Sequence, residues 1–313
     1  MDLKGFDAPG AVVGVSHHRR REVAVTGVAD LSTGVALTVG TPFRIASLSK
    51  TLTAAATVRA LQAKGFALDT PVAEILPELE TQLTVEHVLA QSSGLKQAVD
   101  AETAAALGEG DEVSLAAAKL VVQGGQEYPP GERWAYYNGN YFLAGALLAR
   151  LTEGTFEDGI GDLISTAGLT ATGFSTPDSH AAAHEHGQSL PSAPYPRARR
   201  PSGGLWSTAP DLLTFCEFLL EDKGLLAEIA TPRVSMPLAY GLGWAVGPAG
   251  MLYLNGRLPG YRAAILLSPH DEWAAAMLAN DSDALPAVSA YLDALQHPLT
   301  GVPMARLIDD FAA

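Results

Sequence analysis

Short runs of β-branched and other apolar residues lie near both ends of the chain, and longer helical patterns fill the stretch between them. Near the beginning, apolar runs at 11–15 and 23–28 flank the polar segment 17–21, which is the pattern of a β-hairpin with an exposed turn. Near the end, three more runs predict strands, separated by Gly256, by Pro259-Gly260 and by a polar segment at 269–271. These strands are expected at 251–254, 261–267 and 273–278.

Apolar residues spaced three and four apart predict helices through the middle of the chain and at its end. The expected helices are 47–64, 85–91, 113–122, 141–151, 209–220, 283–296 and 304–311. A stretch rich in proline, serine and arginine, 189–201, is expected to be a loop. Strands at both ends around a helical block indicate one sheet built from the two ends, with a helical lobe inserted into it. We place the sheet lobe at 1–60 and 201–313 and the helical lobe at 61–200.

The composition is that of a globular protein, because 48% of the 313 residues are apolar and 17% are charged. No apolar run has the length of a membrane span. The net charge of −14 argues against nucleic acid and anionic membrane surfaces as partners.

No basic segment followed by an apolar one comes after Met1, so a cytoplasmic location is expected if Met1 is the natural start. Cys216 is the only cysteine in the sequence, and its apolar helical surroundings predict a buried, unreactive thiol.

The first candidate for chemistry is the pair Ser47 and Lys50, at the start of the first expected helix. Residues three apart on a helix are neighbours, so the hydroxyl and the amine would share one face. A buried, neutral amine can take the proton of the serine and so make it a nucleophile. Ser93 and Lys96 have the same spacing, but Gly94 is expected to end a helix between them, so their side chains should diverge. Ser47 is therefore the candidate nucleophile.

A tyrosine and an asparagine follow the stop signal Pro129-Pro130-Gly131. If this segment is extended, Tyr136 and Asn138 point to the same side and the residue between them to the other. A phenol beside a serine and a lysine can carry a proton between the nucleophile and the leaving group. An amide can orient a substrate carbonyl. The alternative is a tyrosine ring packed in the core, and the same Tyr-x-Asn spacing occurs again at 253–255.

Several segments that follow one another along the chain carry a family resemblance. They are the segments 41–50, which contains Ser47-Leu48-Ser49-Lys50, 83–95, which ends in Gln91-Ser92-Ser93-Gly94-Leu95, 203–212, 240–244 and 256–261. With them the chain resembles the serine β-lactamase and penicillin-binding-protein-like (transpeptidase-like) family, in the style of its class C β-lactamase and esterase branch. The second segment is a partial match, because Gln91 and Ser92 stand where the family usually has histidine and threonine.

The resemblance implies an α+β fold in which an antiparallel sheet from both chain ends is flanked by helices, with an inserted, mostly helical lobe and an active site in the cleft between the lobes. It also implies a role for each matching side chain. Ser47 would be the acylated nucleophile, Lys50 its base and Tyr136 the proton relay. Asn138 would orient the substrate.

The same resemblance places an oxyanion hole at the backbone N–H groups of Ser47 and Arg257, with Asn255 and Gly256 as neighbouring substrate-binding residues. The chain departs from the family pattern here, because the lysine or histidine expected two residues before the glycine is Leu254. Losing a charge-assisted contact typically costs roughly a few kcal/mol. Arg257 or Arg262 could replace the cation if its side chain reaches the cleft. The departure favours esters or unusual amides without a carboxylate at the usual position over penicillins.

These observations lead to one favoured hypothesis and two alternatives. The favoured function is a serine hydrolase that forms an acyl-enzyme with an ester or amide of a small molecule. The alternatives are an acyltransferase, which passes the acyl group to an amine or alcohol, and a non-catalytic ligand-binding member of the same fold. No cofactor or metal is expected, because the histidines at 180, 184 and 186 are typical of a solvated loop. Specificity is expected in loops around 95–130 and 155–200, and the oligomeric state is left open.

Overall fold

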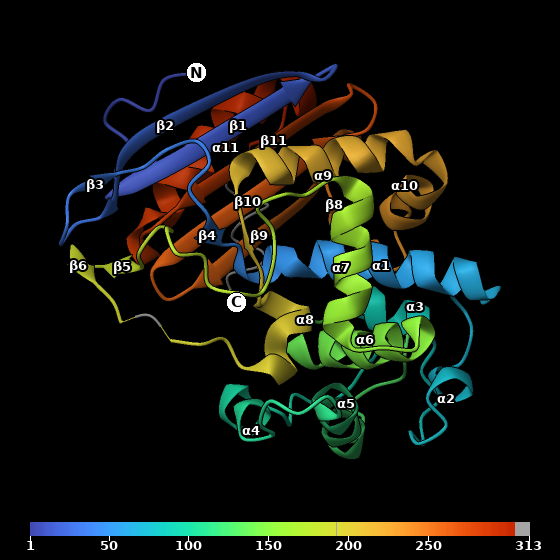
Figure 1. Ribbon diagram of the computed structural model, residues 1–313. Helices are drawn as coiled ribbons and strands as arrows, with labels where there is room; N and C mark the ends of the chain where they lie inside the picture. The colour runs from blue at the N-terminus through green and yellow to red at the C-terminus, as the bar shows by residue number, and fades with distance from the viewer. Residues whose placement is uncertain (192, 304–313) are drawn as a thin grey trace.

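The computed structural model describes residues 1–191 and 193–303, and within them a seven-stranded antiparallel sheet joins segments from the two ends of the chain (Figure 1). The strand order is β3-β2-β1-β11-β10-β9-β8. The strands are β1 (Gly10–His17), β2 (Arg20–Asp30), β3 (Val35–Ala36), β8 (Ala245–Val246), β9 (Leu252–Leu258), β10 (Tyr261–Ser268) and β11 (Trp273–Ala279). The α+β fold class and the sheet built from both ends are therefore confirmed.

The first hairpin shows how the polar segment at its tip makes the turn. His18 and Arg19, the two residues between β1 and β2, both have positive φ values, 47° and 64°. A two-residue turn of that kind matches the right-handed twist of the strands that it joins. In the second half of the sheet, β9 runs on to Leu258, so the prediction that Gly256 separates two strands is wrong: Gly256 lies inside β9.

Helices occupy most of the chain between the two halves of the sheet. They are α1 (Ser49–Lys64), α2 (Val72–Ile75), α3 (Val85–Leu89), α4 (Ala101–Ala105), α5 (Val113–Gln123), α6 (Asn138–Thr152), α7 (Phe156–Ala167), α8 (Arg200–Gly203), α9 (Ala209–Glu221), α10 (Lys223–Ala230) and α11 (Leu285–Thr300). Short 3-10 turns lie at Ala46–Leu48, Arg197–Arg199, Pro248–Gly250 and Ser282–Ala284. Two small ladders complete the structure, β4 (Phe43–Arg44) with β7 (Trp206–Ser207) and β5 (His184–Glu185) with β6 (Gln188–Ser189).

The helices differ from the expected ones in several places, and three of them, α2, α4 and α10, were not expected at all. The segment 189–201 is not wholly a loop, because it contains the 3-10 turn Arg197–Arg199 and the start of α8. Helix α7 lies within a region expected to be loop, and it begins with a capping box in which Thr155 and Asp158 satisfy each other's backbone N–H groups. The helix expected at 304–311 lies outside the described residues.

The sheet and the helices share one continuous core. Figure 1 shows α9 in front of the sheet and α11 behind it, and every residue of β11 is buried, as expected for a strand covered on both faces. A hydrogen bond of 2.6 Å from Ser16 Oγ to Glu217 ties α9 to β1. Helices α1 and α6 pack together in the helical part. None of the helices in the described ranges is both long and apolar enough to cross a membrane. The lobe boundaries given above stay predictions.

Candidate active site

Ser47 lies in a tight 3-10 turn between β4 and α1. Helix α1 begins at Ser49, so the prediction that the helix opens at Ser47 is wrong by two residues. The residue before the serine, Ala46, has a φ of 50°, in the left-handed region that non-glycine residues seldom adopt. Such backbone strain is often found at functional sites. A 3-10 turn still brings residues three apart onto one side, so Lys50 remains next to Ser47.

Lys50 is fully buried, and its amine faces the serine. Its Nζ donates to Ser47 Oγ at 3.1 Å and to the backbone carbonyl of Ser202 at 2.7 Å. The amine also lies 4.9 Å from the centre of the Tyr136 ring. None of the ion pairs in residues 1–191 and 193–303 involves Lys50. Burial, helped by the positive charge of Arg199, lowers the pKa of Lys50 well below its ordinary value.

Tyr136 brings its phenol to the other side of the serine. The distance from Tyr136 Oη to Ser47 Oγ is 2.7 Å, and the same hydroxyl donates to Asn138 Oδ1 at 3.3 Å. Burial raises the pKa of Tyr136 to about 12, although the hydrogen bond with Ser47 and the charge of Arg257 act in the opposite direction. The extended backbone at Tyr137 turns that side chain away, as expected, and its hydroxyl accepts a hydrogen bond from Val99 N at 3.2 Å.

The segment that carries Tyr136 is held by Gln91, which in the sequence stands out only as a departure from the family pattern. Gln91 is fully buried, and its Oε1 accepts from the backbone N–H of Tyr137 at 3.1 Å and from Asn140 Nδ2 at 2.6 Å. The backbone carbonyl of Gln91 also accepts a hydrogen bond from Ala135 N, at 2.9 Å. The Gln91 side chain thus holds the backbone just before Asn138 and the side chain just after it. Gln91 could have been recognised as a site residue from the sequence, because it stands where the family usually has histidine.

Strand β9 passes directly beside the nucleophile. A Cβ on Gly256 would lie 2.3 Å from the carbonyl oxygen of Ile45 and 3.2 Å from the backbone N of Ser47, so only glycine fits there. Alternate N–H groups of an antiparallel strand point toward and away from its partner. Because Leu258 and Tyr261 close the two-residue turn to β10, this register directs the N–H of Arg257 away from β10. The pair of oxyanion donors at Ser47 and Arg257 stays a prediction.

No cation stands at the position of the missing family residue. Leu254 and its neighbour Asn255 are both almost fully buried in β9. Arg262 does not replace the cation, because its guanidinium donates to the carbonyls of Leu258 and Tyr261 at 3.0 and 2.8 Å. The charge of Arg257 acts on the Tyr136 phenol and lowers its pKa. Of the two arginines, Arg257 is therefore the one whose charge reaches the site.

The competing candidates do not form sites. The backbone at Gly94 has a φ of 71°, Lys96 is exposed, and Ser93 Oγ instead accepts from Leu95 N at 3.2 Å. The prediction that His184 is solvated is wrong, because the side chain is fully buried and its Nε2 accepts a hydrogen bond from Leu31 N at 3.2 Å. No cluster of three or more metal-binding side chains occurs in the part of the chain that the structure describes. Cys216 is buried, and burial raises the pKa of its thiol, as expected of an unreactive cysteine.

Comparison with known proteins places this geometry in a family. The family model described as Beta-lactamase matches residues 3–297, and the chain therefore belongs to the Beta-lactamase family. "Penicillin-binding protein 4" of Amycolatopsis lactamdurans is 28% identical over 234 residues, which are 68% of this chain and 60% of that protein. The chain spans about three fifths of the length of the curated relatives that it matches.

Solved structures agree on the fold. The octameric penicillin-binding protein homologue from Pyrococcus abyssi superimposes with a TM-score of 0.82 at 22% identity, over 95% of this chain and 75% of that one. A protein described as a β-lactamase/D-alanine carboxypeptidase from Pseudomonas syringae gives a TM-score of 0.79 at 18% identity, over 92% and 94% of the two chains. At these identities the likeness is one of fold.

Proposed function

We propose that the protein is a serine hydrolase that forms an acyl-enzyme on Ser47 from an ester or amide of a small molecule. One observation carries the proposal: Ser47 Oγ lies 3.1 Å from a buried lysine amine and 2.7 Å from a tyrosine hydroxyl. The lysine has no carboxylate partner among the described residues, and its pKa is lowered well below the ordinary value. A neutral amine next to a serine is the arrangement that activates the hydroxyl.

Acylation begins with the neutral Lys50 amine. For the reaction the 3.1 Å contact reverses, so that the Ser47 hydroxyl donates to the nitrogen lone pair, while one N–H of the amine stays bound to the Ser202 carbonyl. As Ser47 Oγ forms a bond to the substrate carbonyl carbon, its proton moves to Lys50 Nζ. The carbonyl oxygen becomes an oxyanion that the backbone N–H groups of Ser47 and Arg257 stabilise.

Collapse of this intermediate releases the leaving group. The Tyr136 phenol gives its proton to the departing oxygen or nitrogen as the bond from that atom to the carbonyl carbon breaks, and the proton that Lys50 took from Ser47 restores the phenol. Asn138, which accepts a hydrogen bond from the Tyr136 hydroxyl, keeps the phenol in place and presents its amide nitrogen to the substrate. A water molecule then attacks the acyl-enzyme, with the same groups taking its proton and returning it to Ser47.

The substrate class follows from β9. The leucine at position 254 offers no positive charge where the family usually has one. We therefore expect ester or amide substrates that do not need a carboxylate bound at that point, and poor turnover of penicillins and cephalosporins. The Pseudomonas syringae protein is described as a D-alanine carboxypeptidase as well as a β-lactamase, which makes small amides the second substrate class to test.

The test is covalent labelling followed by turnover. The protein is incubated with a fluorophosphonate, and its intact mass is measured; the expected result is one adduct, lost in Ser47→Ala and kept in Ser93→Ala. Turnover of short p-nitrophenyl esters is then compared with that of a chromogenic cephalosporin, and the esters are expected to react faster. An adduct that survives Ser47→Ala, or no adduct at all, would support the ligand-binding alternative. Product analysis with added amines and alcohols separates hydrolysis from acyl transfer.

A further inference from the structure

A pocket lies close to the turn that carries the serine, and both of its cationic residues, Arg44 and Arg199, lie outside β9, the strand that holds Leu254. It has a volume of about 220 Å³ and is lined by Arg44, Tyr195, Arg199, Trp206, Leu258 and Tyr261, with four prolines around it. Three of these side chains are aromatic and two are cationic. The volume suits part of a ligand rather than a whole one, because complete small-molecule sites are typically about 300–1,000 Å³.

Arg44 is a buried cation without a carboxylate. Only 6% of it is exposed, and its guanidinium lies 4.5 Å above the ring of Trp206. Its guanidinium donates to two backbone carbonyls, those of Gly204 at 3.2 Å and Ala193 at 3.4 Å, and none of the ion pairs in the described residues includes it. A guanidinium has five N–H groups, so further donors remain for a ligand. The indole N–H of Trp206 is also buried without a hydrogen-bond partner.

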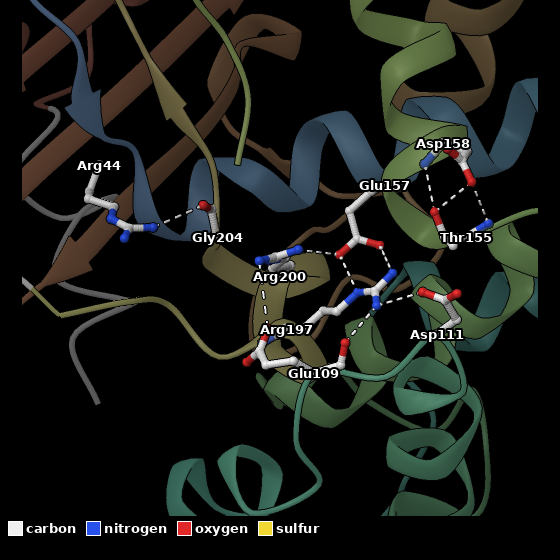
Figure 2. A network of polar contacts seen from close by, with 9 residues as sticks. All are labelled: Arg44, Glu109, Asp111, Thr155, Glu157, Asp158, Arg197, Arg200 and Gly204. Carbon is white, nitrogen blue, oxygen red and sulfur yellow. Dashed lines mark hydrogen bonds and ion pairs between the residues drawn. The ribbon is translucent and has the colours of Figure 1, made fainter. Parts of the chain in front are cut away.

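Arg199 is the second cation, and its neighbours in sequence show what is unusual about it. Figure 2 shows Arg197 and Arg200 gathered on Glu157: Arg197 Nε lies 3.1 Å and Arg200 NH1 2.7 Å from Glu157 Oε1. Arg199, between them, takes part in no ion pair within the described residues. Its guanidinium instead lies 5.1 Å from the centre of the Tyr195 ring, at the pocket. In a chain with 34 acidic and 20 basic residues, two such arginines around one pocket indicate an anionic ligand.

Tyr195, in the wall of the pocket, packs against the segment next to the nucleophile. A Cβ on Gly203 would lie 2.5 Å from Tyr195 Oη and 3.7 Å from the carbonyl carbon of Ala46, the residue before the nucleophile. Arg44 precedes Ser47 by three residues, which span at most roughly 10 Å of extended chain. A substrate bound at Ser47 can therefore reach the pocket with a chain of about four to six atoms.

We propose that this pocket binds a carboxylate carried by the acyl donor, with Arg199 and Arg44 as its cationic partners and the apolar stem of the donor against Trp206 and Tyr261. Guanidinium groups pair with carboxylates through two parallel hydrogen bonds, and such contacts are about twice as strong as neutral ones. Arg44 and Arg199 would thus supply the positive charge that the family usually carries on β9 and that Leu254 lacks. The proposal rests on the proposed function, since it concerns the substrate of the same serine.

The test compares esters that differ only in charge. Mono-p-nitrophenyl adipate carries a carboxylate at the end of the acyl chain, and p-nitrophenyl hexanoate is its neutral counterpart. A second pair, 4-carboxyphenyl and phenyl hexanoate, places the carboxylate on the leaving group. In one of the two pairs the charged ester is expected to have a kcat/KM higher by on the order of tenfold or more, mainly through KM. Equal values within both pairs would overturn the proposal.

Arg199→Gln is the variant that tests the pocket, because Arg199 is only partly buried and lies in no ion pair of the described chain. It is expected to reduce the charged-to-neutral ratio by about tenfold. Any effect of Arg199 on Lys50 cancels in this ratio, since both esters use the same lysine. Arg20→Gln, which removes an exposed arginine of the first hairpin, is the matched control and should leave the ratio unchanged.

Binding separates the two proposals. Calorimetry with adipate on Ser47→Ala protein, with and without Arg199→Gln, needs no catalysis. If Ser47→Ala binds adipate and the double variant does not, while the intact protein turns over no ester, the proposed hydrolase fails and the carboxylate pocket stands. If esters are turned over but Arg199→Gln and Arg20→Gln give the same ratio, the pocket fails and the hydrolase stands.

Discussion

Lys50 Nζ donates a hydrogen bond of 2.7 Å to the backbone carbonyl of Ser202, a residue 152 positions further along the chain. A carbonyl accepts from a neutral amine as well as from an ammonium, so it fixes the direction of the amine without adding a negative charge. A carboxylate at the same place would raise the pKa of the lysine. The contact therefore holds Lys50 in position for Ser47 and leaves the lowering of its pKa by burial intact.

Lys50→Met should abolish most of the activity while keeping the buried shape. Loss of a general base typically reduces the rate by about 10²- to 10⁴-fold. We expect the fluorophosphonate labelling rate and kcat/KM for p-nitrophenyl esters to fall together. Undiminished labelling of the Met variant would show that Lys50 is not the base.

The same variant should be more stable than the parent protein at neutral pH. In the window between the lowered pKa of Lys50 and its ordinary value of 10.5, the unfolded chain binds a proton that the folded chain does not. Stability due to this group therefore rises with pH through that window, and the cost of burying the amine is largest below it. Denaturant unfolding at several pH values should show the difference between Met variant and parent protein shrinking as pH approaches 10.5.

The pH profile of kcat/KM should rise with pH as Lys50 loses its proton. Its ascending limb is expected well below pH 10.5, because burial and the charge of Arg199 both lower the Lys50 pKa. Tyr136, with a pKa of about 12, stays protonated across the range in which the protein is assayed. Arg199→Gln should move the ascending limb to higher pH, and Arg20→Gln should not move it. An unchanged limb in both variants would show that Arg199 has no part in lowering the Lys50 pKa.

Tyr136→Phe should matter most for poor leaving groups. An ethyl ester or an amide needs a proton on its departing atom, so kcat/KM is expected to fall by on the order of 10²-fold. p-Nitrophenolate leaves as an anion, and for its esters the fall should stay below about tenfold. The phenylalanine ring keeps the packing against Trp134. Equal losses for both kinds of ester would argue that the phenol acts on Ser47 alone.

Gly256→Ala should disturb the contact between β9 and the nucleophile. The added Cβ would meet a backbone oxygen, that of Ile45, at 2.3 Å, and a backbone atom cannot rotate away. We expect a loss of stability of about 1–3 kcal/mol and a loss of most activity. Gly161→Ala, on an open surface of α7, is the matched control and should stabilise the protein by about 0.5–1 kcal/mol. Thermal unfolding and ester turnover of both variants check this.

The sheet and the long helices could be predicted because their hydrophobic periods are regular, as in the alternating first hairpin and in α1, which ends at Gly65 as expected. Helix α7 was missed because Gly159 and Gly161 weaken its helical propensity. Its capping box at Thr155 and Asp158 was a readable signal. The turn at Ser47 could not be predicted, because the positive φ of Ala46 has no signature in an alanine.

The proximity of Ser47, Lys50 and Tyr136 was predicted correctly, while their roles stay predictions. The Ser202 carbonyl could not be foreseen, because a backbone oxygen has no mark in the sequence. Arg199 was hidden for a different reason: it lies in a segment rich in proline and arginine that was expected to be loop. Only the structure distinguishes Arg199 from Arg197 and Arg200, because it shows that those two arginines pair with Glu157 and Arg199 does not.

Strand β1 takes its two neighbours from distant parts of the chain, since β2 follows at once and β11 begins only at Trp273. During synthesis the first hairpin can form early, but one edge of β1 stays open until residue 279 has left the ribosome. The unpaired backbone N–H and C=O groups of an open strand edge can form hydrogen bonds with a strand of another chain, which leads to aggregation. Aggregation of this protein should therefore be decided during translation, and a slower elongation rate should lengthen the period of risk.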